Sequence, residues 1–139
     1  MHKNRSVLAG VILFIFGGCL YVCIELLWRR RSHWSMFLIG GACFHMIGQV
    51  FSRLKKKCLL LRCLLSSVLV TGVEFLSGCI LNLKLGLRVW DYTDRRMNAK
   101  GQICMLYSIY WFLLSIPAGF LYKVCQKRFT CCKKGKKRT

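Results

Sequence analysis

The sequence predicts an all-α integral membrane bundle of four transmembrane helices, with both termini in the cytoplasm. Hydrophobic residues make up 55% of the 139-residue chain, and they gather in four stretches separated by basic segments. Each stretch has the length of about 20 residues that a helix needs to cross the hydrocarbon core of a bilayer. Helices are expected because lipid offers no water to satisfy open backbone groups.

The four predicted spans cover residues 6–28, 34–52, 58–83 and 103–124, and a basic cytoplasmic tail follows at 125–139. The first span comes after a short basic head, as a signal peptide would. Its apolar run is too long for a signal peptide, however, and an arginine block follows it where a cleavage site would lie. We therefore expect this span to be retained.

The charge balance also favours a membrane protein. The chain has 23 basic and four acidic residues, for a formal net charge of +19. In a soluble protein this excess would suggest nucleic acid. Here the basic residues lie between and beyond the spans, so the predicted partner is anionic lipid of the inner leaflet and not nucleic acid.

Counting charges on each side orients the bundle. Both termini and the segment between the second and third spans hold 15 basic residues, and the other side holds eight. The positive-inside rule then places the termini in the cytoplasm. In the tail, a solvated segment and a lipid-binding anchor both fit the composition; the anchor's lipid-binding residues would be Lys133, Lys134, Lys136, Lys137 and Arg138.

All four acidic residues are expected in the outer loops or in the half of a span that leads to the non-cytoplasmic side: Glu25, Glu74, Asp91 and Asp94. Glu74 is about ten residues before Lys84, which places it roughly 15 Å deep in the membrane. A carboxylate at that depth is costly, faces the bundle interior and marks a partner or a pathway. This predicts an outward-facing polar pocket around Glu74 and Glu25. The alternative is structural: Glu74 packs helices, and Glu25 pairs with Arg29 one turn away.

Two outer loops, "RRRSHW" and "LKLGLRVWDYTDRRMNAKGQ", are expected to roof this pocket. We predict that Arg29–Arg31 pair with Asp91 and Asp94 to close an outer cap. The tryptophans of these loops also suit the aromatic belt at a membrane interface. The candidate ligand-binding residues are Glu25, Arg29, Arg31, His33, Trp34, Glu74, Asn82, Trp90, Asp91, Tyr92, Asn98 and Gln102.

The sequence predicts no catalytic residues, no cofactor and no metal site. It contains no phosphate-binding glycine loop, catalytic triad, zinc helix motif or dinucleotide fingerprint. A membrane enzyme that uses His33 with Asp91 or Glu25 as acid and base is a weaker alternative, because no nucleophile is evident. The ten cysteines read as small, buried, reduced thiols, and Cys19 with Cys23 lacks the further ligands of a metal site.

Three segments carry a resemblance to a known family: "IELLWRRRSHWSMFLIGG", "GVEFLSGCILNLKLGLRVWDYTD" and "GQICMLYSIYWFLLS". They resemble the small bacterial membrane proteins called "putative ABC-transporter type IV" or "putative ABC transporter permease", through the motifs W-R-x-R-S-H-W-S-M and V-W-D-Y. The resemblance implies several spans in a bacterial plasma membrane. Its matching residues are Glu25, Trp28, Arg29, Arg31, Ser32, His33, Trp34, Glu74, Asn82, Trp90, Asp91, Tyr92, Asn98, Gly101 and Gln102.

Arg30, "TDRRMN" and the cysteine-rich tail depart from the family pattern. We expect a permease-like or transport-associated membrane protein of unknown solute. The alternative is a non-transporting accessory protein that binds a larger membrane partner or anionic lipid. Any ATP-driven role needs a separate ATPase subunit, since the chain has no phosphate-binding loop. The sequence leaves a homo-oligomer open.

Overall fold

The structure is a computed structural model that describes the backbone of residues 2–131 and the side chains of residues 7–129. Its elements in chain order are α1 (His2–Arg29), α2 (Trp34–Arg53), α3 (Leu59–Gly78), the π-helix η1 (Cys79–Lys84), β1 (Asn98–Ala99), β2 (Ile103–Cys104) and α4 (Met105–Cys131).

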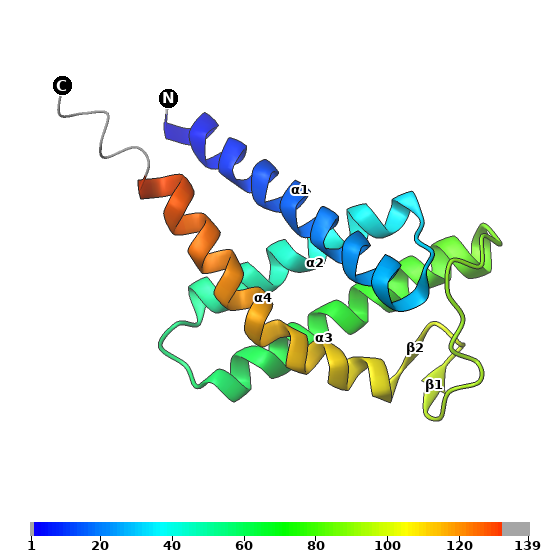
Figure 1. The fold of residues 1–139 in the computed structure, drawn as a ribbon. Coiled ribbons are helices and arrows are strands. Elements are labelled where there is room, and N and C mark those ends of the chain that lie inside the picture. The colour runs from blue at the N-terminus through cyan, green and yellow to red at the C-terminus, as the bar shows by residue number, and fades with distance from the viewer. Residues whose placement is uncertain (1, 132–139) are drawn as a thin grey trace, which may run out of the picture.

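The helices run back and forth between two ends of the molecule (Figure 1). At one end lie the start of α1, the turn between α2 and α3, and the end of α4; we call this the terminal end. At the other lie the turn between α1 and α2, η1 and the segment 85–104, which contains β1 and β2; we call this the hairpin end. Four helical segments are long and apolar enough to span a membrane: Val7–Arg29, Trp34–Arg53, Leu59–Lys84 and Met105–Phe129.

The predicted four-helix membrane bundle is therefore confirmed. The placement of both termini in the cytoplasm stays a prediction, although the helices that carry them meet at the terminal end as four spans require. The α4 helix continues to Cys131, seven residues past the predicted end of the fourth span. The five tail residues proposed to bind lipid, 133, 134 and 136–138, lie outside the described residues.

Close contact between α1 and α2 depends on glycines. A Cβ atom on Gly18 would lie 2.6 Å from the backbone oxygen of Phe37, and one on Gly41 would lie 2.7 Å from that of Phe14. Real Cβ atoms do not approach that closely, so only glycine lets these helices pack at this spacing. Half of the spanning stretch of α2 is buried, against 17% for α1 and for α4. The α2 helix is thus the centre of the bundle.

The apolar core is built around α2. Cys43, Ile47 and Phe51 pack against Cys63 and Val70 of α3. Many large apolar side chains on α1, α3 and α4 are exposed, as expected of surfaces that face lipid. All eight described cysteines are free.

The prediction that the cysteines are buried is wrong for three of the eight described cysteines. Cys19, Cys23 and Cys58 are exposed, the first two on a face of α1 that points away from the other helices.

The end of the third span departs from an α-helix. Residues Cys79–Lys84 form a wider π-helical turn, closed by the Leu85 amide donating to the carbonyl of Ile80. Such turns change which residues face inward and are frequent at functional sites. Here the turn directs Asn82 into the bundle, where the segment 85–104 folds back over it. Within that segment β1 and β2 pair antiparallel, with Asn98 opposite Cys104.

Candidate functional site

A cavity of about 160 Å³ opens at the hairpin end between the two loops. One wall comes from the end of α1 and the turn into α2, and the other from the start of the segment 85–104. Its lining residues are Glu25, Arg31, Ser32, His33, Leu87, Arg88 and Val89. The cavity therefore brings together Glu25, Arg31 and His33 of the predicted site. Glu74 is not among its lining residues.

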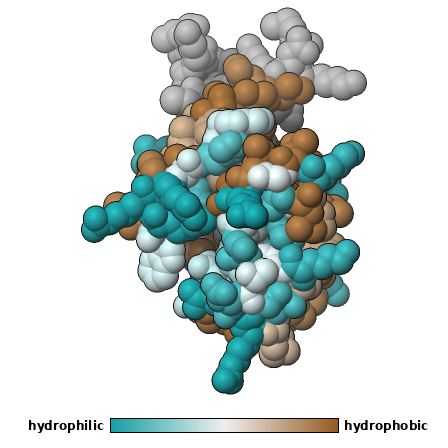
Figure 2. Space-filling model, turned by 90° about the vertical axis from the view of Figure 1, so that its right-hand side faces the viewer, coloured by the Kyte–Doolittle hydropathy of each residue, from teal (hydrophilic) through white to brown (hydrophobic). Residues whose placement is uncertain are grey.

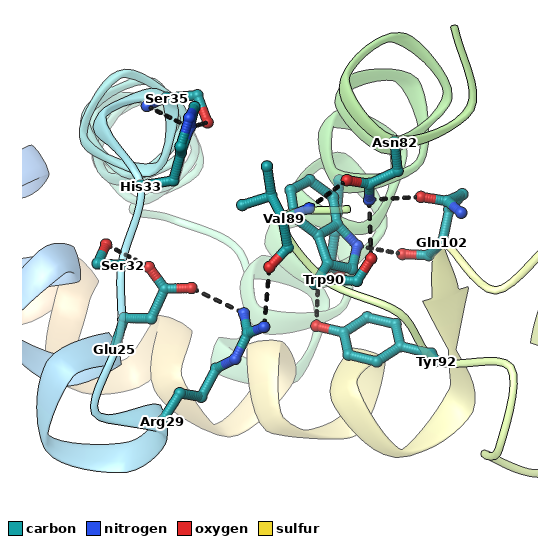
Figure 3. Close-up of polar contacts among 11 residues, drawn as sticks. Glu25, Arg29, Ser32, His33, Ser35, Asn82, Val89, Trp90, Tyr92 and Gln102 are labelled. Carbon is teal, nitrogen blue, oxygen red and sulfur yellow. Dashed lines mark hydrogen bonds and ion pairs between the residues drawn. The ribbon is translucent and has the colours of Figure 1, made fainter. Parts of the chain in front are cut away.

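Glu25 is buried beside this cavity and fully engaged by neighbouring side chains (Figure 3). Arg29 Nη1 donates to Glu25 Oε1 at 2.9 Å, and Ser32 Oγ donates to Oε2 at 2.6 Å. Arg29 Nη2 also donates to the carbonyl of Val89 at 2.9 Å. The pairing of Glu25 with Arg29 one turn away is thus confirmed. It joins α1 to the segment 85–104.

The prediction that Arg29–Arg31 pair with Asp91 and Asp94 is wrong. Among the side chains of residues 7–129, the only ion pair is that of Arg29 with Glu25. Arg29 pairs with Glu25 because Glu25 lies on the same helix, one turn away. Asp91 instead accepts a hydrogen bond from the Thr93 amide at 2.9 Å. That bond to the backbone holds the pKa of the exposed Asp91 carboxyl below its usual range, with a smaller contribution from the charge of Arg88.

Glu74 forms a second polar site, inside the bundle. Its side chain is only 7% exposed. Tyr92 Oη donates to Glu74 Oε1 at 3.0 Å, and Trp111 Nε1 donates to Oε2 at 3.0 Å. The two donors come from the segment 85–104 and from α4, so the carboxylate ties three parts of the chain together.

Aromatic rings extend this site on both sides. Tyr21 of α1 stacks on Trp111 with ring centroids 5.8 Å apart, and Tyr92 stacks on Tyr107 at 4.5 Å. Burial raises the pKa of the Tyr92 hydroxyl well above its usual value, and the nearby Glu74 charge and the hydrogen bond to it act in the same direction. Tyr92 therefore stays protonated and remains a hydrogen-bond donor.

Three predicted site residues hold the segment 85–104 in place (Figure 3). Asn82 Nδ2 donates to the carbonyl of Trp90 at 2.9 Å and to Gln102 Oε1 at 2.8 Å. Asn82 Oδ1 accepts from the Val89 amide at 2.7 Å. Trp90 is 2% exposed, and its Nε1 donates to the carbonyl of Gln102 at 2.9 Å. Because these groups satisfy one another, they form a scaffold, and Asn82, Trp90 and Gln102 are not among the residues that line the cavity described above.

The remaining predicted residues lie apart from both sites. Trp34 is 69% exposed and contacts the ring of His33, with centroids 5.4 Å apart. Asn98 accepts from the Gly101 amide and donates to the carbonyls of Thr93 and Arg95, so it shapes the tip of the hairpin. Gly101 has a φ of +68°, a conformation that favours glycine at this turn.

Sequence reasoning did not select two residues that prove central. Arg88 lines the cavity, and Trp111 is the second donor to Glu74. Arg88 could have been found as an unpaired charge on the outer side. No signal marked Trp111, because it is one of many aromatic residues in an apolar helix. Within the described part of the chain, no three His, Cys, Asp or Glu side chains gather to hold a metal ion.

The fold and these sites define a multi-pass helical membrane protein with polar groups inside the bundle and at one end. Comparison with known families places it more narrowly. Residues 1–135 match the family described as "Putative ABC-transporter type IV", and the chain belongs to that family. It is thus a transport-associated membrane protein, as the resemblance of its motifs implies. No solved structure matches the chain.

Proposed function

We propose that the chain is a permease-like protein of the bacterial cell membrane, with a solute entrance at the hairpin end that is closed in this structure. Glu74 carries the proposal: a carboxylate in the middle of a span is expensive, and such groups usually mark a pathway. Its bonds to Tyr92 and Trp111 connect α3 to the segment 85–104 and to α4. In this proposal, the hydrogen bonds that Glu74 accepts hold the entrance closed.

The segment 85–104 supports this role because it reaches both polar sites. Leu87, Arg88 and Val89 form one wall of the cavity, and Tyr92, three residues further on, donates to Glu74. A movement of this short stretch would widen the cavity and release Glu74 at the same time. Two sites that are separate in the closed state would then join into one pathway.

The chain is not an enzyme in this proposal, and ATP-driven transport would need an ATPase subunit. That subunit would meet the terminal end, which is cytoplasmic in the proposed orientation. The end of α2 and the turn that follows it offer the charged residues Arg53, Lys55, Lys56 and Lys57 there. An accessory role without transport is the alternative. Mass spectrometry of proteins that co-purify in mild detergent separates the two, since an ATPase among them supports the permease.

A direct test compares Glu74→Gln with the unchanged protein in cells. Culture medium is profiled by mass spectrometry for small molecules whose depletion or export depends on the chain. We expect at least one such solute, with its flux reduced about tenfold or more in Glu74→Gln because the substituted group is a charge at mid-membrane depth. Equal flux in both proteins would exclude the role of Glu74.

Asp94→Asn is the matched control. It removes one negative charge from an exposed position of the segment 85–104 and leaves the hydrogen bonds to Glu74 intact. Flux should stay at the level of the unchanged protein when both variants reach the membrane in equal amounts. A solute profile identical to that of cells lacking the chain would instead favour the accessory role.

A further inference from the structure

The hairpin end is more basic than membrane topology explains. The positive-inside rule accounts for cations at the terminal end but not for the eight expected on the other side. Figure 2 views the molecule from the hairpin end and shows hydrophilic side chains gathered there, with hydrophobic ones around them. Arg31 and Arg88, both exposed, come from the two opposite walls of the cavity.

The cavity itself carries excess positive charge. Its one acidic lining residue, Glu25, is paired with the charge of Arg29 and accepts a hydrogen bond from Ser32. Arg31 and Arg88 have no carboxylate within ion-pair distance among the described residues. Asp91 affects Arg88 through its charge, but its carboxylate is held by the Thr93 amide. Two arginines thus line the cavity without an ion-pair partner among the described residues.

The start of α2 adds to this field. His33 lines the cavity and caps the helix, with its Nδ1 accepting from the Ser35 amide. The positive end of the helix dipole therefore lies at the cavity wall, where it favours negative charge. The arginine side chains and the helix end both favour an anion in this cavity.

The size of the cavity restricts the kind of anion. Sites for drug-sized molecules measure about 300–1,000 Å³. A space of about 160 Å³ is smaller, and fits a compact polyatomic ion or the terminal group of a larger molecule. Guanidinium groups donate paired hydrogen bonds whose spacing matches the oxygens of phosphate.

We infer that the cavity between the two loops of the hairpin end is a phosphate-binding site, with Arg31 and Arg88 as its main ligands. This inference rests on the proposed function in one respect, since it names the ligand class admitted at the entrance. The phosphate group could be free in solution or part of a lipid headgroup at the membrane surface. The site itself does not require that transport takes place.

Binding is tested with the full chain in neutral detergent, titrated with inorganic phosphate at about 0.15 M ionic strength by isothermal calorimetry. We expect saturable binding of one phosphate per chain, weakened about tenfold or more in the Arg31→Gln, Arg88→Gln double variant because two paired donors are lost. Replacing both by lysine keeps the charge but not the paired donors. It should also weaken binding, though less.

The matched control is Arg95→Gln with Arg96→Gln, which removes two charges from the exposed hairpin away from the cavity. Its affinity should stay within about twofold of the unchanged protein, because the effect of exposed charges is screened by salt. Equal losses in both double variants would show a general charge effect and overturn the site. Absence of saturable binding to phosphate and to lipid would do the same.

A second arm identifies the source of the phosphate. Native mass spectrometry follows the protein transferred from vesicles of phosphatidylcholine with or without phosphatidylglycerol. Retention of one phosphatidylglycerol, lost in Arg31→Gln with Arg88→Gln, assigns the lipid headgroup; phosphate binding unaffected by that lipid assigns the free ion. Phosphate binding is measured on the purified protein in detergent, where no flux takes place. A defect in flux and a defect in phosphate binding can therefore be told apart.

Discussion

Three of the four acidic side chains, Glu25, Glu74 and Asp91, are each held by a different kind of partner. Glu25 meets an arginine and a serine on its own helix and loop, and Asp91 meets a backbone amide. Glu74 meets two aromatic donors that carry no charge. Because neutral donors satisfy the carboxylate without a fixed counter-charge, its attachment is the one that movement of the neighbouring segments can most readily undo.

Asp91 gives a prediction about pH. Its hydrogen bond from Thr93 stabilises the charged form, so the folded pKa lies below the usual value of about 3.9. The contribution of this bond to the turn is therefore complete above about pH 4 and is lost as the pH falls through the folded pKa. Carbon NMR of the Asp91 carboxyl in micelles measures this. In an Asp94→Asn background no other aspartate signal remains.

We expect the Asp91 signal to titrate clearly below 3.9. A midpoint at or above that value would show that the bond to Thr93 does not persist in solution. Asp91→Asn serves as the control for the turn, because its side-chain oxygen still accepts from the amide but no longer titrates in this range.

At the scale of elements, the sequence predicts the helices far better than their contacts. The apolar stretches define the four spans, because the requirement for satisfied backbone groups leaves no other structure in lipid. Glycines let membrane helices approach closely, and α1 packs on α2 in this way at Gly18 and Gly41. The π-helical turn at Cys79–Lys84 has no comparable signal, because it depends on how the segment 85–104 packs against Asn82.

The glycine contacts predict opposite effects of one substitution at two positions. Gly41→Ala places a Cβ 2.7 Å from a backbone oxygen of α1, and should destabilise the bundle by about 1–3 kcal/mol. Gly72→Ala meets nothing within 4 Å, and should be neutral or stabilise α3 by up to about 1 kcal/mol. Thermal unfolding of the purified variants in detergent measures both. Equal midpoints would contradict the close packing of α1 on α2.

The candidate site was only partly predictable for a related reason. Glu74 stands out in the sequence because it is a charged residue in the middle of a predicted span. Its direction toward the bundle interior follows from the free-energy cost of exposing a carboxylate to lipid. Its partners come from a loop and from another helix, and their identity depends on the rotation of α4 and the path of the segment 85–104. The sequence offers Arg29 two kinds of acidic partner, Glu25 on its own helix and the aspartates of the outer loop, and the structure pairs it with Glu25.

At the scale of the whole molecule, orientation is the first property to measure. The basic excess at the terminal end predicts that both termini face the cytoplasm. Green fluorescent protein fused after Thr139 should therefore fluoresce, and alkaline phosphatase at the same position should be inactive. Alkaline phosphatase fused after Arg96 in the hairpin should be active. The reverse pattern would place the cavity in the cytoplasm and remove its role as an outer entrance.

In the proposed function, one hydroxyl group that reaches from the segment 85–104 into the bundle helps to hold the hairpin end closed. Tyr92→Phe removes the hydrogen bond to Glu74 and keeps the ring that stacks on Tyr107. Tyr110→Phe is the matched control, since the described structure gives its hydroxyl no hydrogen bond and its ring packs edge-on against Tyr107. Both variants lose one hydroxyl from the same aromatic cluster.

Hydrogen exchange of residues 85–97, measured by mass spectrometry of the full chain in detergent, tests most directly whether Glu74 holds the hairpin end closed. We predict about fivefold or faster exchange in Tyr92→Phe than in the unchanged protein, because a hydrogen bond contributes about 1 kcal/mol or more to closing the segment. Tyr110→Phe should exchange at the rate of the unchanged protein. Identical exchange in Tyr92→Phe and Tyr110→Phe would contradict the claim that Glu74 holds the hairpin end closed.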